Sequence, residues 1–487
     1  MIGKKKIQYL ILIIILIIFG GYFFKESKFS LIKSTNFNSF LNEKNKKFIK
    51  KYFLPYKLIA QQERLIKFKE GEFKYLRNLL PYLLDLELEV KDIGTDIRVD
   101  ESNIFLSNNK NLKKYKLNLG FFYGIHSRFP GSGYIDFYKD NIFVISSRGV
   151  LAYSQKLIDK SIFKQIDNNI NEFIGLEEFK KDYRYSLKDL FIFKNKIFVS
   201  YIEVIKKDNP DTLDLNEECV NTSILVGDIN YEKITFKRLF SSQEAVEEEF
   251  SFSKCIPVLG KGFQPHQSGG RIINFDNDHI LFSLGEYRYR FLAQNEKSIN
   301  GKIIKIKIDD GSYKIISMGH RNPQGLYFDK KNNFILETEH GPQGGDEINL
   351  IDVKKLNSNK IQNYGWPISS AGEHYGGRVK KNEELYKKYP LYDSHIAYGF
   401  IEPIKSFVPS IGISEIVKIK ENKYVASSLK DKSLYFFELN KNRKLIDLKR
   451  VEVFERIRDL KYKDNKLYLF MEGTASIGVI SYDKESS

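Results

Sequence analysis

The sequence predicts an all-β protein, a six-bladed β-propeller, preceded by an N-terminal transmembrane helix and a short helical stem. Three observations support this prediction. One long apolar stretch, Ile7–Phe24, opens the chain, and apolar residues then recur at helical spacing up to about residue 90. From about residue 120 the apolar period changes to two, and one hairpin pattern recurs six times. The expected boundaries are 1–25 for the transmembrane helix, 26–115 for the stem and 116–487 for the propeller.

The N-terminal segment has the composition of a membrane anchor. Lys4, Lys5 and Lys6 precede the apolar stretch, which is long enough to span a bilayer as a helix. Because lysines stay on the cytoplasmic side, the rest of the chain is expected in the periplasm. A cleaved signal peptide is the alternative, but the bulky and basic sequence Tyr22–Lys25 lacks the small residues of a cleavage site. We therefore expect a single-pass anchor in the inner membrane.

The stem is predicted from Leu, Ile and Phe residues at helical spacing among Lys and Glu between residues 36 and 90. Pro55 and Pro81 interrupt this pattern or begin helices. The stem helices could pair with a second copy of the chain or lie against the propeller, and the sequence leaves both arrangements open.

The propeller is predicted from six hairpins, each an apolar strand, a tight turn with Asp, Asn or Lys, and a second apolar strand. About 365 residues divided among six units leave roughly 60 for each, enough for a four-stranded blade and its loops. The six hairpins pair 135–138 with 142–145, 190–193 with 197–200, 272–275 with 280–283, 326–329 with 334–337, 416–419 with 424–427, and 460–462 with 467–470.

Composition limits the possible partners. The net charge is +16, but lysine is scattered through the chain, which favours a compositional bias over a binding patch. An anionic ligand or a membrane surface remains the alternative. No basic stripe with interleaved aromatic residues is present, so no nucleic acid partner is expected.

The two cysteines, Cys219 and Cys255, are too few for a zinc site, and in an exported chain they are expected to form a disulfide.

Loops rich in glycine, proline, arginine and histidine stand beside the hairpins, and they bring too little apolar surface to serve core packing. They place backbone carbonyls, amides and cations at defined positions instead. The loops are His266–Arg271, Gly319–Gly325, Glu339–Asn349, Asn363–Pro367, Ser428–Lys430 and Arg456–Asp459.

Taken together and in this order, these loops resemble the quinoprotein glucose/sorbosone dehydrogenase family, the soluble sugar dehydrogenases that use pyrroloquinoline quinone (PQQ). The resemblance covers about residues 130–480. It implies a PQQ- and Ca²⁺-dependent enzyme that oxidises an aldose at C1 to its lactone and passes the electrons to an external acceptor. Calcium accepts backbone carbonyl oxygens, so the carbonyls of Gly341 and Pro342 are the implied metal ligands.

The resemblance also implies a role for each matched side chain. His266 would be the general base, since an imidazole takes up a proton near neutral pH. Arg321 and Asn322 would contact the quinone carbonyls of the cofactor and stabilise the negative charge that develops there as hydride arrives from C1. PQQ carries three carboxylates, which cations pair with. The implied cationic partners are Lys430, Arg456 and Arg458.

Three departures from the family pattern bear on the substrate. Pro265 precedes the histidine where a polar residue is common, and Gly285–Arg290 replaces the usual stretch after the third hairpin. Arg184 stands where a cofactor-binding glutamine is expected. The alternative reading is a non-catalytic periplasmic propeller that binds a glycan or protein partner.

Overall fold

The structure is a computed structural model that describes residues 97–108, 110–117, 132–174, 184–205, 219–242, 265–358, 360–374 and 384–482. They belong to one compact unit, Glu72–Ser487. The predicted anchor, most of the predicted stem and Cys255 lie outside the described residues, so the transmembrane helix, the stem helices and the disulfide stay predictions. Within the described ranges, no helix is long and apolar enough to cross a membrane.

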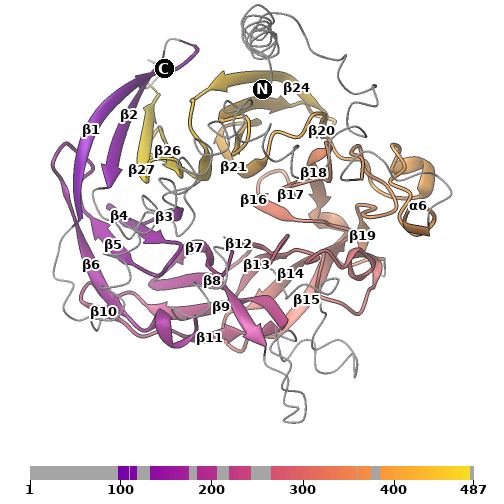
Figure 1. Ribbon diagram of the computed structural model, residues 1–487, viewed down its shortest axis with the longest axis horizontal. Coiled ribbons are helices and arrows are strands. Elements are labelled where there is room, and N and C mark those ends of the chain that lie inside the picture. The colour runs from indigo at the N-terminus through magenta and orange to yellow at the C-terminus, as the bar shows by residue number, and fades with distance from the viewer. Residues whose placement is uncertain are drawn as a thin grey trace, which may run out of the picture. The chain divides into compact units, whose positions relative to one another are not determined.

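The described strands form six four-stranded blades arranged in a ring (Figure 1). The prediction of an all-β protein is thereby confirmed. The blades are β3–β6 (Gly133–Tyr138, Asn141–Ser146, Leu151–Ser154, Ile162–Asn168), β7–β8–β9–β11 (Leu187–Phe193, Lys196–Ile205, Cys219–Asp228, Lys237–Phe240), β12–β15 (Gly269–Asn274, His279–Leu284, Lys302–Lys307, Tyr313–Met318), β16–β17–β18–β20 (Pro323–Asp329, Phe334–Glu339, Asp346–Asp352, Lys405–Phe407), β21–β24 (Ile413–Lys420, Lys423–Ser428, Ser433–Leu439, Leu445–Glu452), and β25–β26–β27–β2 (Ile457–Lys463, Lys466–Met471, Ser476–Ser481, Asn111–Leu117).

Short elements complete the described part of the chain. Two short strands pair in parallel with outer strands of the blades: β10 (Lys233–Ile234) pairs with β6, and β19 (Gln362–Asn363) pairs with β15. The remaining elements of the described residues are the strand β1 (Ile97–Phe105), the helix α6 (Glu384–Lys388), and the 3₁₀ turns Ile170–Glu172, Arg290–Gln294, Val353–Lys355 and Ile396–Tyr398.

The six predicted hairpins are confirmed, and each forms the two innermost strands of one blade. Ile135 faces Val144 in the first hairpin and Leu460 faces Leu469 in the last. Several turns place Lys, Asn or Asp at positive φ, such as Lys139, Lys194 and Asn422. Tight hairpin turns require a positive φ, and Asn and Asp adopt it more readily than Lys does.

Apolar side chains hold neighbouring blades together face to face. In β17, Phe334 and Leu336 pack toward the β21–β24 blade, whereas Ile335 packs toward the β12–β15 blade. Six such clusters among the described residues fill the six blade interfaces. Strands of this type are apolar on both faces because each is covered on both sides.

Carboxylates on the innermost strands also join the blades. Asp459 accepts the Ile135 amide at 2.9 Å, Asp136 accepts that of Ile192 at 2.7 Å, and Asp189 accepts that of Ile272 at 2.7 Å. Each bond runs from one blade to the next. The innermost strands pack side by side around the full circle, including β25 beside β3.

One guanidinium neutralises several of these acids. Arg271 on β12 pairs with Asp189 at 2.6 Å, Asp459 at 2.9 Å and Glu415 at 2.6 Å, and all four side chains are buried. Exclusion of water raises the pKa of Asp189 to about 6 and that of Glu415 to about 8, although the charges of Arg271 and Lys461 oppose the shift.

The ring is closed by strands from both ends of the described chain. β2 pairs with β27, so that Lys113 faces Val479, and β1 connects β2 to β6 of the first blade. Among the described residues, Ile97–Phe105 already belongs to the propeller sheet, ahead of residue 116, where the sequence placed the start of the propeller. In the sequence, β2 resembles a polar linker because it is rich in lysine and because β27, the strand that it pairs with, lies far along the chain.

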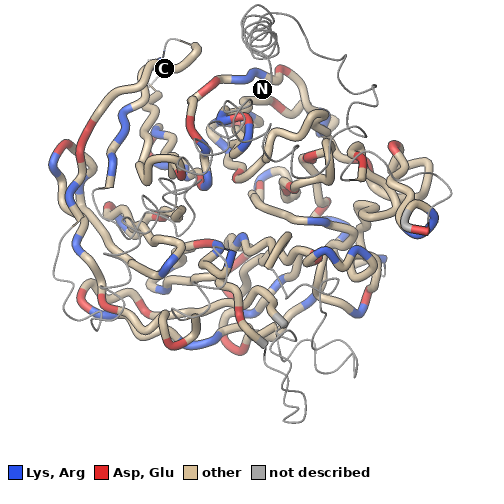
Figure 2. Tube along the Cα trace, in the orientation of Figure 1, with Lys and Arg blue, Asp and Glu red and all other residues tan. Residues whose placement is uncertain are grey.

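Basic and acidic residues are interspersed around the ring (Figure 2). Lys and Arg do not gather on one blade of the described residues, in keeping with the compositional reading of the net charge.

Candidate active site

Two adjoining cavities lie at one end of the ring among the described residues. One measures about 300 Å³ and the other about 560 Å³, and both are lined by His266, Gln267, Asn322 and His340. Their walls come from segments just before an innermost strand or just after the second strand of a blade. These segments meet at the same end because the innermost strand of every blade begins there.

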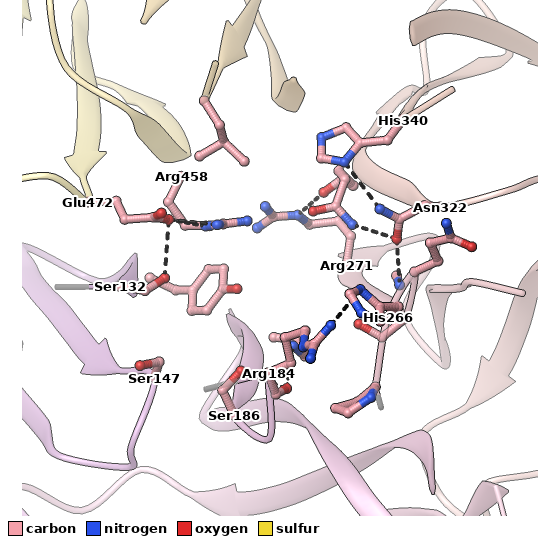
Figure 3. A pocket seen from close by; sticks show the side chains of 18 of the residues that line it. Ser132, Ser147, Arg184, Ser186, His266, Arg271, Asn322, His340, Arg458 and Glu472 are labelled. Carbon is pink, nitrogen blue, oxygen red and sulfur yellow. Dashed lines mark hydrogen bonds and ion pairs between the residues drawn. The ribbon is translucent and has the colours of Figure 1, made fainter. Parts of the chain in front are cut away.

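All eight residues predicted for the site line these cavities. Arg456 and Arg458 line the first cavity, in which Figure 3 labels Arg458. Arg321, Gly341, Pro342 and Lys430 line the second. His266 and Asn322 line both. Loops separated by nearly two hundred residues are therefore brought to one place.

The His266 ring contacts a cationic side chain, Arg184. Arg184 Nη1 lies 2.8 Å from His266 Nδ1, and both side chains point into the first cavity (Figure 3). A guanidinium has only donors, so Nδ1 accepts this hydrogen bond. The neutral ring then carries its hydrogen on Nε2, and its basic nitrogen is the one that Arg184 contacts.

Arg321 lies over the loop that follows β17. Its Nη1 donates to the carbonyl oxygens of His340 at 2.8 Å and Gly341 at 2.6 Å, and its guanidinium lies 5.3 Å from the Trp366 ring centre. Its own backbone amide donates to the Glu339 carboxylate at 2.5 Å. Arg321 is thus held from both its backbone and its side chain.

Asn322 and His340 orient each other. Asn322 Nδ2 donates to His340 Nδ1 at 3.2 Å, while His340 Nε2 donates to the Ile413 carbonyl at 2.5 Å. Burial and the neighbouring Arg321 lower the pKa of His340, although Asp346 opposes the shift. His340 is therefore a neutral, fully engaged ring.

The loop that contains Gly341 is built around a carboxylate. Asp346 accepts the amides of Gly341 at 3.1 Å, Gly412 at 2.6 Å and Ile413 at 3.1 Å. A Cβ on Gly341 would lie 2.0 Å from the Gly345 carbonyl oxygen, so no larger residue fits. Asp346 therefore supports the loop through three backbone amides.

Arg456 and Arg458 share one carboxylate, Glu472. Arg456 Nε lies 3.0 Å from Oε1. Arg458 Nη2 lies 2.6 Å from Oε2 (Figure 3). Burial alone would raise the pKa of Glu472, but the two guanidinium groups hold it below its usual value. Glu472 thus holds both guanidinium groups in place at the wall of the first cavity.

Sequence reasoning did not assign several residues of the cavities. Arg148, Lys188 and Glu472 line the first cavity and Arg288 the second. They stand on segments beside the innermost strands, and this position is the signal that would have identified them. Arg184 was noted as a departure, but its contact with His266 was not foreseen.

Glu286, from the departing stretch after β13, is fully buried beside the site. Its carboxylate faces the guanidinium groups of Arg321 and Arg290 and the backbone of Arg288. Loss of water raises its pKa to about 7, although Arg321 and Arg290 oppose the shift.

Fold and cavity together define a six-bladed propeller with a cation-lined pocket at one end of its axis. The sequence model of the family "Glucose / Sorbosone dehydrogenase" matches residues 230–478, half of the chain. The chain therefore belongs to this family.

Curated relatives support the assignment. The chain is 26% identical to the Aldose sugar dehydrogenase YliI of Escherichia coli, over 49% of this chain and 65% of that protein. It is 30% identical to the Quinoprotein glucose dehydrogenase B of Acinetobacter calcoaceticus, over 36% and 37%. An uncharacterised Synechocystis protein is 28% identical over 42% and 53%. The matched segments thus span between 37% and 65% of these relatives.

Solved structures share the fold. A crystal structure of a glucose dehydrogenase has a TM-score of 0.52 at 19% identity, covering 72% of this chain and 96% of that one. The soluble aldose sugar dehydrogenase of Escherichia coli, in its apo-form, has a TM-score of 0.51 at 21% identity, covering 72% and 95%. At these identities the likeness concerns the fold.

Proposed function

We propose that this protein is a PQQ- and calcium-dependent sugar dehydrogenase that oxidises an aldose at C1 to its lactone. The observation that supports it most is the convergence of His266, Arg321, Asn322 and the three cations of distant loops on two adjoining cavities. The family membership and the aldose and glucose dehydrogenases among the relatives agree with this proposal.

The donor set of the cavities suits PQQ. A tricarboxylate needs several cations, and Lys430, Arg456 and Arg458 line the cavities with Arg321. Calcium suits the carbonyl oxygens of Gly341 and Pro342, because it is a hard ion that prefers oxygen ligands. Arg321 Nη1 donates to the Gly341 oxygen in this structure, so the guanidinium would have to release that oxygen and keep its bond to the His340 carbonyl when the ion binds. When bound, PQQ supplies the two-electron acceptor, and calcium supplies the cation that holds it against the loop.

The side chains have separate tasks in this proposal. His266 takes the proton of the anomeric hydroxyl, and Arg321 stabilises the negative charge that develops during oxidation. Asn322 keeps its position through His340. The hydrogen bond from Arg321 Nη1 to the His340 carbonyl is formed before the reaction begins, so this contact needs no reorganisation at that moment.

Arg184 adds a condition to this scheme. His266 takes up a proton at Nδ1 only after Arg184 has moved away, or after the ring has turned over. We propose that cofactor or substrate draws Arg184 off the ring. The same contact is the observation that favours the alternative, a propeller that binds a glycan or protein partner without redox chemistry.

We further propose that residues 1–25 anchor the protein in the inner membrane with the propeller in the periplasm, where an external acceptor collects the electrons. The lysines before the apolar stretch Ile7–Phe24 support this orientation. Fusions of a periplasm-dependent reporter to the C-terminus test it.

The enzymatic proposal is tested with the full chain in calcium. PQQ is titrated while its absorption spectrum is followed, and a panel of aldoses is then added with an artificial dye acceptor. We expect stoichiometric binding that a calcium chelator abolishes, and dye reduction that His266→Ala removes. His279→Ala is the matched control. His279 lies at the turn of the β12–β13 hairpin, the end away from His266, and its ring pairs with Asp276. Absence of PQQ binding would refute the proposal, and binding without turnover of any aldose would favour the non-catalytic alternative.

A further inference from the structure

A second cluster of potential ligands lies beneath the Arg321 loop, outside the two cavities. It consists of His320, Glu337 and Glu339, each at most 3% exposed. One ligand atom from each lies within 4.8 Å of the others. Glu337 and Glu339 point to the same face of β17, since alternate strand residues share a face.

The cluster has too few donors for its carboxylates. Asn349 Nδ2 contacts Glu337 at 3.0 Å, Glu339 at 3.0 Å and Glu347 at 3.4 Å, although an amide has only two hydrogens. Glu337 Oε1 is buried and has no hydrogen-bond partner among the described residues. Buried carboxylates are costly unless a cation compensates them.

His320 is oriented as a metal-binding histidine would be. Its Nε2 lies 2.8 Å from the Ser317 hydroxyl, while its Nδ1 lies 3.3 Å from Glu339 Oε1 and 3.8 Å from Glu337 Oε2. Histidine ligands commonly donate from the second ring nitrogen to an outer partner, which fixes the ring. Ser317 fits that outer position, and it leaves Nδ1 for an ion.

We propose that His320, Glu337 and Glu339 bind a divalent first-row transition metal ion of the Zn²⁺ or Mn²⁺ type, at a site separate from the one proposed for calcium. An imidazole nitrogen with two carboxylates suits these ions, whereas calcium prefers oxygen ligands alone. Glu339 Oε2 accepts the Arg321 amide, so the ion would fix the position of the Arg321 loop. Its role is structural support of that loop.

The rival explanation is a cluster held together by protons. Burial and the proximity of Glu339 raise the pKa of Glu337 and Glu347, so protonated carboxyl groups could replace the cation. The two explanations differ in whether the folded protein takes up a metal ion.

The full chain is stripped with a chelator, returned to excess calcium and titrated calorimetrically with ZnCl₂ and with MnCl₂. We expect one equivalent of one of these ions to bind, with affinity at least tenfold weaker in Glu337→Gln. Glu203→Gln, another buried glutamate, is the matched control and should bind as the wild type does. Mass spectrometry of the native protein measures the metal content independently.

Ser317→Ala provides a second variant, because loss of the outer partner should weaken the ion roughly tenfold or more without removing a ligand. If neither ion binds, or if Glu337→Gln and Ser317→Ala bind as the wild type does, the proposal is overturned in favour of shared protons. The readout is independent of PQQ, so a protein without dehydrogenase activity can still pass or fail this test.

Discussion

The position of His266 depends on a glycine in the neighbouring strand connection. A Cβ on Gly285 would lie 1.8 Å from the Gln267 carbonyl oxygen, and real contacts of this kind are at least 3.0 Å. Gln267 has a φ of 56° and its carbonyl accepts the Tyr287 amide, so it has little freedom to adjust. Gly285→Ala should therefore push the loop that contains His266 by about 1 Å or more, and a displacement of this size can cost about 10²-fold in rate.

The expected loss is in kcat/KM, by about 10²-fold, or about 2.7 kcal/mol of activation free energy. It is measured by dye reduction with PQQ and calcium at saturation. PQQ binding should weaken much less, because Lys430 and Arg456 stand on other blades. Gly473→Ala is the matched control, since the nearest atom to its added Cβ is a flexible Glu455 oxygen at 3.6 Å.

Two results would refute the reasoning. A folded Gly285→Ala protein with wild-type kcat/KM would show that the His266 loop tolerates displacement. Equal losses in Gly285→Ala and Gly473→Ala would show that the effect is general rather than local. Circular dichroism and the thermal midpoint establish that both variants fold.

Three further predictions concern single contacts. Arg184→Leu should raise kcat/KM for the aldose by up to about tenfold, because the ligands no longer have to displace from His266 Nδ1 a hydrogen bond from a cation, worth about 1.5 kcal/mol; a lower kcat/KM would contradict this. Glu472→Gln should lower the thermal midpoint at pH 7 but change it little in acid. The pKa of Glu472 is depressed in the fold, so its stabilisation is present above the unfolded value of about 4.3 and is lost as pH falls below it; parallel losses at both pH values would contradict that sign. Tyr424→Phe removes a 2.6 Å bond between blades to Asp329 and should cost about 1.5–3 kcal/mol in the free energy of unfolding, measured in urea, with kcat unchanged.

The inner half of each blade was predictable from the sequence because its signals are local. Strands such as Ile142–Ser146 and Ile197–Ser200 are continuous apolar runs beside a tight turn, since neighbouring blades cover both faces. Outer strands lack this signal. Half of the residues of β24 (Leu445–Glu452) are exposed and half are charged, so its pairing with β23 is not evident from composition.

The site was predictable where residues form a motif, as at Gly319–Gly325 and Arg456–Asp459. Contacts between distant loops were not, because side-chain geometry is absent from the sequence. Arg184 and His266 meet although 82 positions separate them. Glu472 follows a strand end with no motif of its own, yet it pairs with both Arg456 and Arg458.

The pairing of β2 with β27 sets an order of events during synthesis. β2 leaves the ribosome early, and its partner is the last described strand, so two segments about 370 residues apart must find each other at the end. Such a contact raises the contact order and slows folding. Until it forms, the edges of both strands are open templates for pairing with other chains. Newly made protein is therefore most exposed to aggregation just before the final strand docks.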